Sequence, residues 1–160
     1  MWLGMDLGTD RPGATPVGGL VRVDAATNGV RDALLPGTRV FRVVSDGDAV
    51  YALGIETSAA GVTLVRVDRP GEIGATAHLG LNTLSAGDGQ LWFGGFDFDP
   101  SSSAGDEPGL VGQVDPATLQ ALRTTHVDAT AQTYRLHMAA ANGVVWVLVP
   151  ETSTLYRITP

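Results

Sequence analysis

The chain contains no cysteine and no lysine, and each absence excludes certain kinds of site or binding partner. Without cysteine there are no disulfides, no thiolate nucleophile and no zinc ribbon. All ten basic residues are arginine, and they are outnumbered by 17 acidic residues, which gives a formal net charge of −7 at pH 7. Such an acidic chain is poorly suited to binding nucleic acid or an anionic membrane surface.

Long hydrophobic runs are also missing. No apolar stretch approaches the roughly 18 residues that a membrane-spanning helix needs. The N-terminus lacks the basic and apolar regions of a signal peptide, so an exported protein would carry its signal outside this segment. The lysine-free composition, rich in alanine, glycine, valine and arginine, is typical of bacterial proteins encoded by GC-rich genomes.

The residues that are present favour a β-protein. Hydrophobic residues make up 44% of the 160 positions, enough for a domain with its own core. The 21 glycines and 9 prolines are too many for a helical bundle, but they suit short strands joined by tight turns. The composition therefore predicts an all-β fold.

Two short sequence elements recur at the same interval. The pentapeptide Leu-Val-Arg-Val-Asp occurs at 20–24 and 64–68, with variants at 111–115 and 155–159, so its last position recurs after 44, 47 and 44 residues. An Asp/Asn-Gly turn followed by an aromatic-centred apolar strand keeps the same interval. Its copies lie at 46–51, 88–92 and 142–146, with a shortened copy at 2–5. Two elements in register indicate an internal repeat of about 45 residues.

Each repeat reads as four strands in up-and-down order. A short apolar strand leads through the Asp/Asn-Gly hairpin turn into the aromatic strand. The Leu-Val-Arg-Val-Asp strand follows, with arginine alternating between valines, and a turn leads to a more polar last strand such as 119–127. Four strands per repeat are typical of a β-propeller blade. A β-sandwich or barrel is the alternative, but it would not require equivalent positions to recur at this interval.

The predicted fold is therefore an all-β propeller of about three and a half four-stranded antiparallel blades. We predict a partial blade over 1–38, full blades over 39–80 and 81–130, and a partial blade over 131–160, with three, four, four and three strands. A closed propeller usually has at least four blades. We expect either further blades in the same polypeptide, which we favour, or self-association. Two copies would supply seven blades, although simple head-to-tail closure would place a third strand before a second one.

The blade pattern resembles a known group of propellers. The order Asp/Asn-Gly, apolar residue, Trp, loop and Leu-x-Arg-Val-Asp-x-x-Thr resembles the blades of streptogramin-lyase-like, NHL and YVTN-type propellers, best over 89–118 and 142–158. The resemblance implies a bacterial envelope or secreted protein, hence an extracytoplasmic location. For the streptogramin-lyase-like enzymes it also implies a metal ion and acid–base histidines at the channel mouth.

One position of the innermost strand carries polar residues of three types. Arg42, Thr83 and His137 each lie nine residues before the aromatic residue of the next strand, so we expect them to line the channel and to bind a ligand there. The alternative is that they only meet channel water. By the resemblance, His137 corresponds to an acid–base histidine. His78 and His126 fall on outermost strands, which leaves His137 without the partner that acid–base catalysis needs.

The longest variable loop is acidic. Asp97 and Asp99 alternate in it, and Asp106 lies nearby, offering oxygen ligands of the kind that Ca²⁺ or Mg²⁺ prefers. The spacing of an EF-hand is absent. The alternative, which we favour, is an acidic surface loop without a cofactor. Since loops often carry recognition, Asp97 and Asp99 are also candidate binding residues.

These observations predict a non-catalytic propeller that binds a protein or a small-molecule ligand at its channel mouth or loops, or serves as a scaffold. The alternative is a streptogramin-lyase-like lyase or hydrolase that is metal-assisted and uses His137. A carboxylate or second histidine within reach of His137 would separate the two. We also expect Tyr51, Trp92 and Trp146 to occupy equivalent buried positions between blades.

Overall fold

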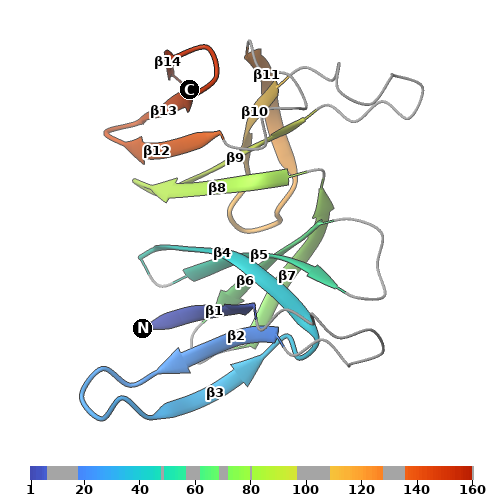
Figure 1. The fold of residues 1–160 in the computed structure, drawn as a ribbon, viewed down its shortest axis with the longest axis vertical. Coiled ribbons are helices and arrows are strands. Elements are labelled where there is room, and N and C mark those ends of the chain that lie inside the picture. The colour runs from blue at the N-terminus through green and yellow to red at the C-terminus, as the bar shows by residue number, and fades with distance from the viewer. Residues whose placement is uncertain are drawn as a thin grey trace. The chain divides into compact units, whose positions relative to one another are not determined.

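The computed structural model describes residues 1–6, 18–47, 49–56, 62–68, 72–79, 81–96, 109–127 and 136–159. Over these ranges the chain forms fourteen β-strands and no helix (Figure 1). The all-β prediction is confirmed. In the same ranges, no helical segment meets the length and apolarity that crossing a bilayer requires.

The strands form four antiparallel sheets, and in each sheet the strands lie in chain order. The strands are β1 (Trp2–Asp6), β2 (Gly18–Val23), β3 (Val30–Leu34), β4 (Thr38–Asp46), β5 (Ala49–Glu56), β6 (Val62–Asp68), β7 (Glu72–Leu79), β8 (Leu81–Gly87), β9 (Gln90–Phe96), β10 (Gly109–Val114), β11 (Ala121–Val127), β12 (His137–Ala141), β13 (Val144–Val149) and β14 (Thr154–Ile158). The sheets are β1–β3, β4–β7, β8–β11 and β12–β14. Their three, four, four and three strands in the described ranges equal the predicted numbers.

The chain divides into two compact units. The first comprises Met1–Val44 and Asp48–Leu79, and the second comprises Ser45–Gly47 and Gly80–Pro160. The first unit therefore contains β1–β3 and most of β4–β7, and the second contains the other two sheets. Each unit has its own apolar core.

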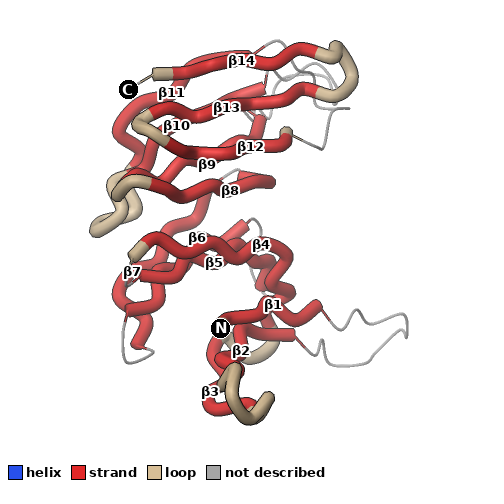
Figure 2. The backbone as a smooth tube through the Cα atoms, turned by 90° about the vertical axis from the view of Figure 1, so that its left-hand side faces the viewer, coloured by secondary structure: helices blue, strands red, loops and turns tan. Residues whose placement is uncertain are grey.

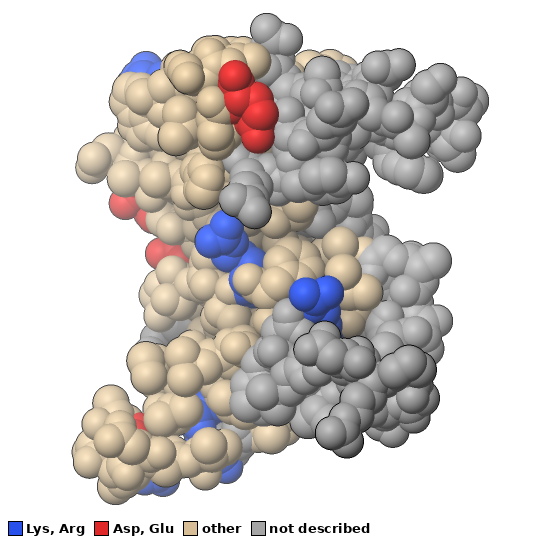
Figure 3. All heavy atoms as spheres, in the orientation of Figure 1, with Lys and Arg blue, Asp and Glu red and all other residues tan. Residues whose placement is uncertain are grey.

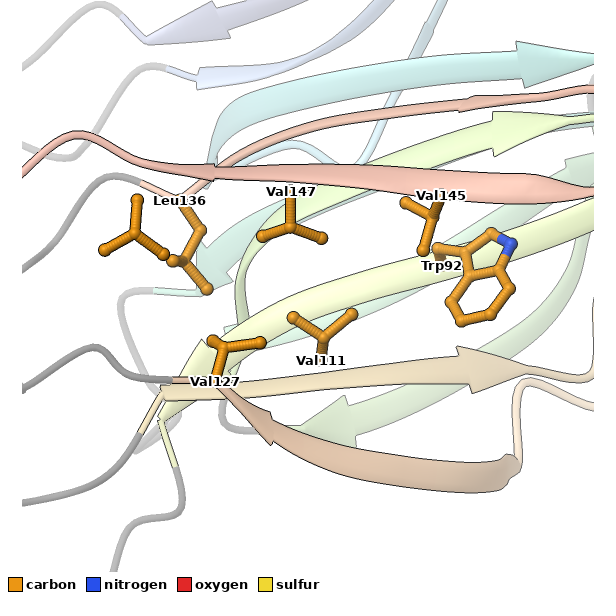
Figure 4. Packing of buried hydrophobic residues seen from close by; sticks show 7 residues of the cluster. Trp92, Val111, Val127, Leu136, Val145 and Val147 are labelled. Atoms are coloured by element: carbon orange, nitrogen blue, oxygen red, sulfur yellow. The ribbon is translucent and has the colours of Figure 1, made fainter. Parts of the chain in front are cut away.

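The core of each unit lies between its two sheets. In the first unit it consists of Leu20, Val40, Val50, Ala52, Val65 and Val67, with Trp2, Leu34, Leu35 and Val43 packed against it. In the second unit it consists of Trp92, Val111, Val127, Leu136, Val145, Val147 and Val149, and these side chains point toward one another from facing strands (Figure 4). Burying each of the valine and leucine side chains contributes about 1.5–3 kcal/mol, so these contacts hold the sheet pairs together.

Two glycines allow the sheets of each unit to approach closely. A Cβ atom on Gly4 of β1 would lie 2.7 Å from Cγ1 of Val40, and one on Gly94 of β9 would lie 2.8 Å from the sulfur of Met138. Both glycines come two residues after a tryptophan in the sequence. The absence of a side chain at this position lets the first strand of the following sheet pack against the backbone.

The same turn follows β2 in the first sheet and β10 in the third, the two strands that carry the recurring pentapeptide there. The Asp24 carboxylate accepts hydrogen bonds of 2.8 and 3.3 Å from the backbone N–H groups two and three residues later, and Asp115 does the same at 2.7 and 2.9 Å. Asn28 and Leu119, at the same place in each turn, have φ angles of 55° and 60°. Because Leu119 belongs to this left-handed turn, β11 begins at Ala121, and the predicted strand start at 119 is wrong.

A β-bulge recurs beside these turns. In three sheets the pairing of the last strand with the strand before it shifts register, after Arg22 in β2, after Arg66 in β6 and after Gln113 in β10. All three residues occupy the third position of the recurring pentapeptide. A bulge at one motif position in three sheets bends each last strand in the same local manner.

The prediction of three equivalent buried aromatic residues is wrong for one of them. Tyr51 and Trp92 are buried, with 4% and 1% of their surface exposed, but Trp146 is 40% exposed. On β13 the alternate residues Val145 and Val147 face the core of the second unit. Trp146 therefore lies on the opposite face of the β12–β14 sheet, which no strand of the described part of that unit covers.

Candidate functional site

The three predicted channel residues lie in different surroundings. Arg42 is exposed on β4 in the first unit, whereas Thr83 on β8 and His137 on β12 belong to the second. Thr83 and His137 hold equivalent positions, because each pairs across its hairpin with the residue two places after a tryptophan. Strands β8 and β12 run side by side, joined by a 2.9 Å hydrogen bond from the Ala140 backbone N–H to Ser85 Oγ (Figure 2).

Thr83 is a packing residue in this structure and not the accessible lining residue that we expected. Its surface is 2% exposed. Its Cγ2 atom lies 2.8 Å from the position a Cβ on Gly94 would occupy, and that position is also close to Leu136 and Met138. The β12 strand and the residue before it cover Thr83, so a ligand from solvent does not reach it.

His137 is exposed on the outer face of the β12–β14 sheet. Cross-strand partners share a face, which places His137 beside Leu148 and Ala139 beside Trp146. The next partners along these rows are Leu155 and Arg157 of β14. These rows contain no carboxylate and no second histidine. The acid–base partner of His137 that the lyase alternative requires is therefore absent from its cross-strand neighbours.

The acidic loop candidates Asp97, Asp99 and Asp106 lie outside the described residues. Within the described ranges, no cluster of three or more histidine, aspartate or glutamate side chains is placed to hold a metal ion. His126, which we expected on an outermost strand, lies on β11, the last strand of its sheet, and is exposed.

A cleft that the sequence did not reveal lies between β11 and β14 in the second unit. Its volume is about 380 Å³. It is lined by Trp92, Val111, Gly112, Arg123, Thr124, Thr125, His126, Val127, Tyr156, Arg157, Ile158 and Thr159. Both β11 and β14 are last strands of their sheets, so the cleft opens between two strand edges.

An aromatic and a cationic side chain meet in the cleft lining. The Arg123 guanidinium carbon lies 5.2 Å from the centre of the Trp92 ring, and Trp92 Nε1 donates a 3.1 Å hydrogen bond to Gln90 Oε1. Trp92 and Arg123 lie in one cross-strand row, on either side of Gln113. A similar pair, Arg22 over Trp2 at 5.8 Å, occurs in the first unit. The stacking holds the Arg123 cation over an apolar floor and contributes about 0.5–1 kcal/mol at an exposed site.

The cleft lining carries positive charge and hydroxyl groups but no carboxylate. The lining residues with a titratable side chain are Arg123, His126, Tyr156 and Arg157, in a chain whose net charge is −7. Of these, Arg157 lies in one cross-strand row with Trp146, on the outer face of its sheet. On the face drawn in Figure 3, described basic and acidic side chains form small separate groups among uncharged atoms. A local cationic cleft therefore suits an anionic group of limited size, which the threonine hydroxyls can also hydrogen-bond.

The cleft exists because the β12–β14 sheet has three strands in the described residues. In the four-stranded sheets a fourth strand, β7 or β11, lies beside the third. No described strand lies at the corresponding place beside β14. Two features of the sequence could have indicated the cleft: the repeat of four strands and the shorter last copy of that repeat. The sequence analysis instead interpreted Arg157 as part of the recurring motif and His126 as a solvated surface residue.

No protein-family model matches this chain, and no curated protein matches it.

Proposed function

We propose that this chain is a non-catalytic β-propeller segment that binds a protein or small-molecule partner through the cleft between β11 and β14. In this proposal it belongs to an extracytoplasmic or secreted bacterial protein resembling the streptogramin-lyase-like, NHL and YVTN-type propellers. The observation that carries the binding function is the cleft lining. It brings the Arg123 cation, stacked on Trp92, together with Thr125 and Tyr156, and no carboxylate is among its described residues.

Several local features support the propeller arrangement. Each sheet is an up-and-down meander, and in each unit two consecutive sheets pack through an apolar core. The same turn, bulge and close-approach glycine recur at corresponding positions. In a propeller, equivalent four-stranded blades pack face to face around an axis, which requires these features to recur from blade to blade.

Binding is favoured over catalysis by the surroundings of the titratable groups. General acid–base chemistry needs two groups within reach of one reacting atom. His137 lies in a cross-strand row with Leu148 and Leu155, neither of which can exchange a proton. The cleft contains cations with hydrogen-bond donors, which recognise a ligand without needing to exchange protons with it.

The cleft function can be tested through the fluorescence of Trp92. A Trp2→Phe/Trp146→Phe variant leaves Trp92 as the only tryptophan, since the chain contains three. Because Trp92 lines the cleft, a bound ligand should change its emission saturably. The probes are inorganic phosphate, benzoate, a neutral oligosaccharide, and acidic, neutral and basic peptides.

We expect at least one anionic probe to bind and to raise the melting temperature, and the basic peptide to leave the emission unchanged. Absence of any saturable change with all of the probes would contradict the proposed function. Preferential binding of the basic peptide would contradict the assigned charge preference of the site.

A further inference from the structure

We propose that Asn28, in the turn between β2 and β3, is a site of spontaneous deamidation that converts it to aspartate or isoaspartate. The chain has three asparagines, and two of them, Asn28 and Asn142, precede a glycine. Glycine carries no Cβ that would shield its backbone nitrogen, so an Asn-Gly pair is especially prone to this reaction. The surroundings of the two glycine nitrogens determine which pair reacts.

The reaction needs only the chain and water. The Gly29 backbone nitrogen attacks the side-chain Cγ of Asn28, and the new C–N bond closes a succinimide ring. The Gly29 proton leaves with the side-chain nitrogen as ammonia. Water then opens the ring at one of its two C–N bonds. Opening at Cγ gives aspartate, whereas opening at the backbone carbonyl gives isoaspartate, in which the main chain runs through the side chain.

The Gly29 nitrogen is weakly held. Its N–H donates to the hydroxyl of Thr27 at 3.3 Å, longer than the usual range of about 2.7–3.2 Å for an N–H···O bond. Residues 25–30 are exposed, so solvent reaches this turn. Asn28 itself has a φ angle of 55°, a conformation that asparagine adopts more readily than most residues. The nitrogen that must attack is therefore in an exposed turn and bound only by a long hydrogen bond.

The Gly143 nitrogen, by contrast, is bound to a carboxylate. Its N–H donates to Asp88 Oδ2 at 3.1 Å. Attack requires this nitrogen to give up its proton, and negative charge on the nitrogen is disfavoured beside the Asp88 carboxylate. Asn142 and Gly143 also form a two-residue hairpin loop between the paired residues Ala141 and Val144, which holds their backbone in place. The second Asn-Gly pair should therefore remain intact in the folded chain.

The product would alter the β2–β3 turn where backbone hydrogen bonds close it. The Asn28 N–H donates to the Asp24 carbonyl at 2.8 Å, and the Asp24 N–H donates to the Gly29 carbonyl at 2.9 Å. Isoaspartate adds a methylene group to the main chain between these bonds, so the two bonds no longer fit one backbone. The equivalent turn after β10 has Leu119 followed by Gln120 at this place and cannot undergo the reaction.

The test is incubation of the folded chain at mildly alkaline pH, followed by proteolytic peptide mapping with mass spectrometry. We expect residue 28 to gain the mass that replacement of NH2 by OH adds, while residue 142 stays unmodified over the same period. In urea both pairs should react at similar rates, because the hydrogen bond that protects Gly143 is lost on unfolding. This comparison uses the unaltered chain and attributes the difference to the fold.

A variant tests the attack by the Gly29 nitrogen. Gly29→Ala should slow the reaction at residue 28 at least about tenfold, because the added methyl group hinders the approach of the nitrogen to Cγ. The φ angle of Gly29 is outside the left-handed region, and the closest atom to the new Cβ is the Thr27 hydroxyl oxygen at 3.2 Å. The turn can therefore accept the substitution, and a melting curve establishes that the variant is folded.

A second variant tests the protection of residue 142. Asp88→Gly removes the carboxylate and keeps a residue that tolerates the φ angle of 56° at this position. We expect residue 142 to deamidate at least about tenfold faster in this variant, because its neighbouring nitrogen loses the charged acceptor. Asp46→Ala is the matched control. It removes the carboxylate that accepts from the Gly89 N–H in the same manner, and it should leave residue 142 intact.

Four results would overturn the inference. They are faster deamidation at residue 142 than at residue 28 in the folded chain, no reaction at residue 28, the same preference in urea as in buffer, and an unchanged rate in Gly29→Ala. None of them bears on ligand binding in the cleft, so the proposed function is tested independently.

Discussion

The four aromatic positions of the recurring motif differ mainly in what lies over them. Trp92 is enclosed by the facing sheet and by Arg123, whereas Trp146 holds the same motif position on an outer face. Local sequence determines where each ring lies on its strand. The β12–β14 sheet covers Trp92, whereas no described strand of the same unit covers Trp146.

Replacing these two tryptophans with alanine should therefore have unequal effects. Trp92→Ala removes a ring that is 99% buried and should lower the free energy of unfolding by about 3–5 kcal/mol. Trp146→Ala removes a ring that is 40% exposed and should cost about 1 kcal/mol or less. Chemical denaturation of the two variants measures both quantities, and equal losses would show that the assignment of the core face is wrong.

Asp24 gives the β2–β3 turn a dependence on pH. The hydrogen bond from the Ala26 backbone N–H, followed by that from the Arg31 side chain, lowers the pKa of Asp24 below its usual value. A lowered pKa means that the folded state favours the carboxylate. The resulting stability is fully present above the unfolded pKa of about 3.9 and is lost as the pH falls through the lower folded value.

Asp24→Asn should therefore be less stable than the wild type at pH 7, with the difference shrinking as the pH falls below about 4. The amide side chain keeps an oxygen that can accept the turn hydrogen bonds but loses the ion pair with Arg31. Urea denaturation across this pH range measures the difference. An Arg31→Gln control should remove part of the same pH dependence, and a difference that grows on acidification would contradict the assignment.

At the scale of elements, β8 and β12 are joined by side-chain contacts to the backbone. Ser85 accepts from the Ala140 N–H, and the Asp88 carboxylate accepts from the Gly143 N–H at 3.1 Å. Gly87 lies so close to β12 that a Cβ on it would be 2.5 Å from the Ala140 carbonyl oxygen. These contacts fix the position of the first strand of one sheet against the first strand of the next.

Ser85→Ala should destabilise the protein by about 1–3 kcal/mol, because the Ala140 N–H loses its acceptor in a partly buried position. The exposed Ser45 on β4 provides a matched control, and Ser45→Ala should change the stability by less than about 0.5 kcal/mol. Thermal unfolding of both variants is the measurement. Similar melting temperatures for the two variants would show that water replaces the Ser85 hydroxyl at no cost.

The sequence predicted the positions of the strands more successfully than the surroundings of individual side chains. Strands could be placed because alternating valines and the Asp/Asn-Gly turns are local signals. The burial of Thr83 could not be predicted, because it depends on the approach of β12 to Gly94. Strand β12 lies about 40 residues after Gly94 in the sequence, so no local pattern signals this contact. Leu119 was placed in a strand because leucine rarely adopts a positive φ angle. The cleft was missed because it is formed by the edges of two separate sheets.

At the scale of the whole molecule, the outer face of the β12–β14 sheet carries several exposed apolar side chains in the described residues. Trp146, Leu148 and Leu155 are 40%, 38% and 59% exposed. Cross-strand pairing places all three on the same face. Adjacent exposed apolar residues of this kind mark an interaction surface more often than a solvated one.

The chain should consequently self-associate unless further blades of the same polypeptide cover this face. Light scattering over a range of concentrations should show species larger than the monomer. A Leu148→Glu/Leu155→Glu variant should shift the distribution toward the monomer, because it places two charges on the contact face. A wild-type chain that remains monomeric at high concentration, with no further blades in the natural protein, would contradict this prediction.

The order of strands within the sheets has a consequence for how the chain folds. Every described strand pairs only with strands adjacent to it in the sequence. Each pairing therefore closes a short loop, and the entropy of loop closure is lost in small steps. All-β proteins with distant pairings fold slowly, because their long loops must close before contacts form. The hairpins of this chain can form one after another while the polypeptide is still emerging from the ribosome.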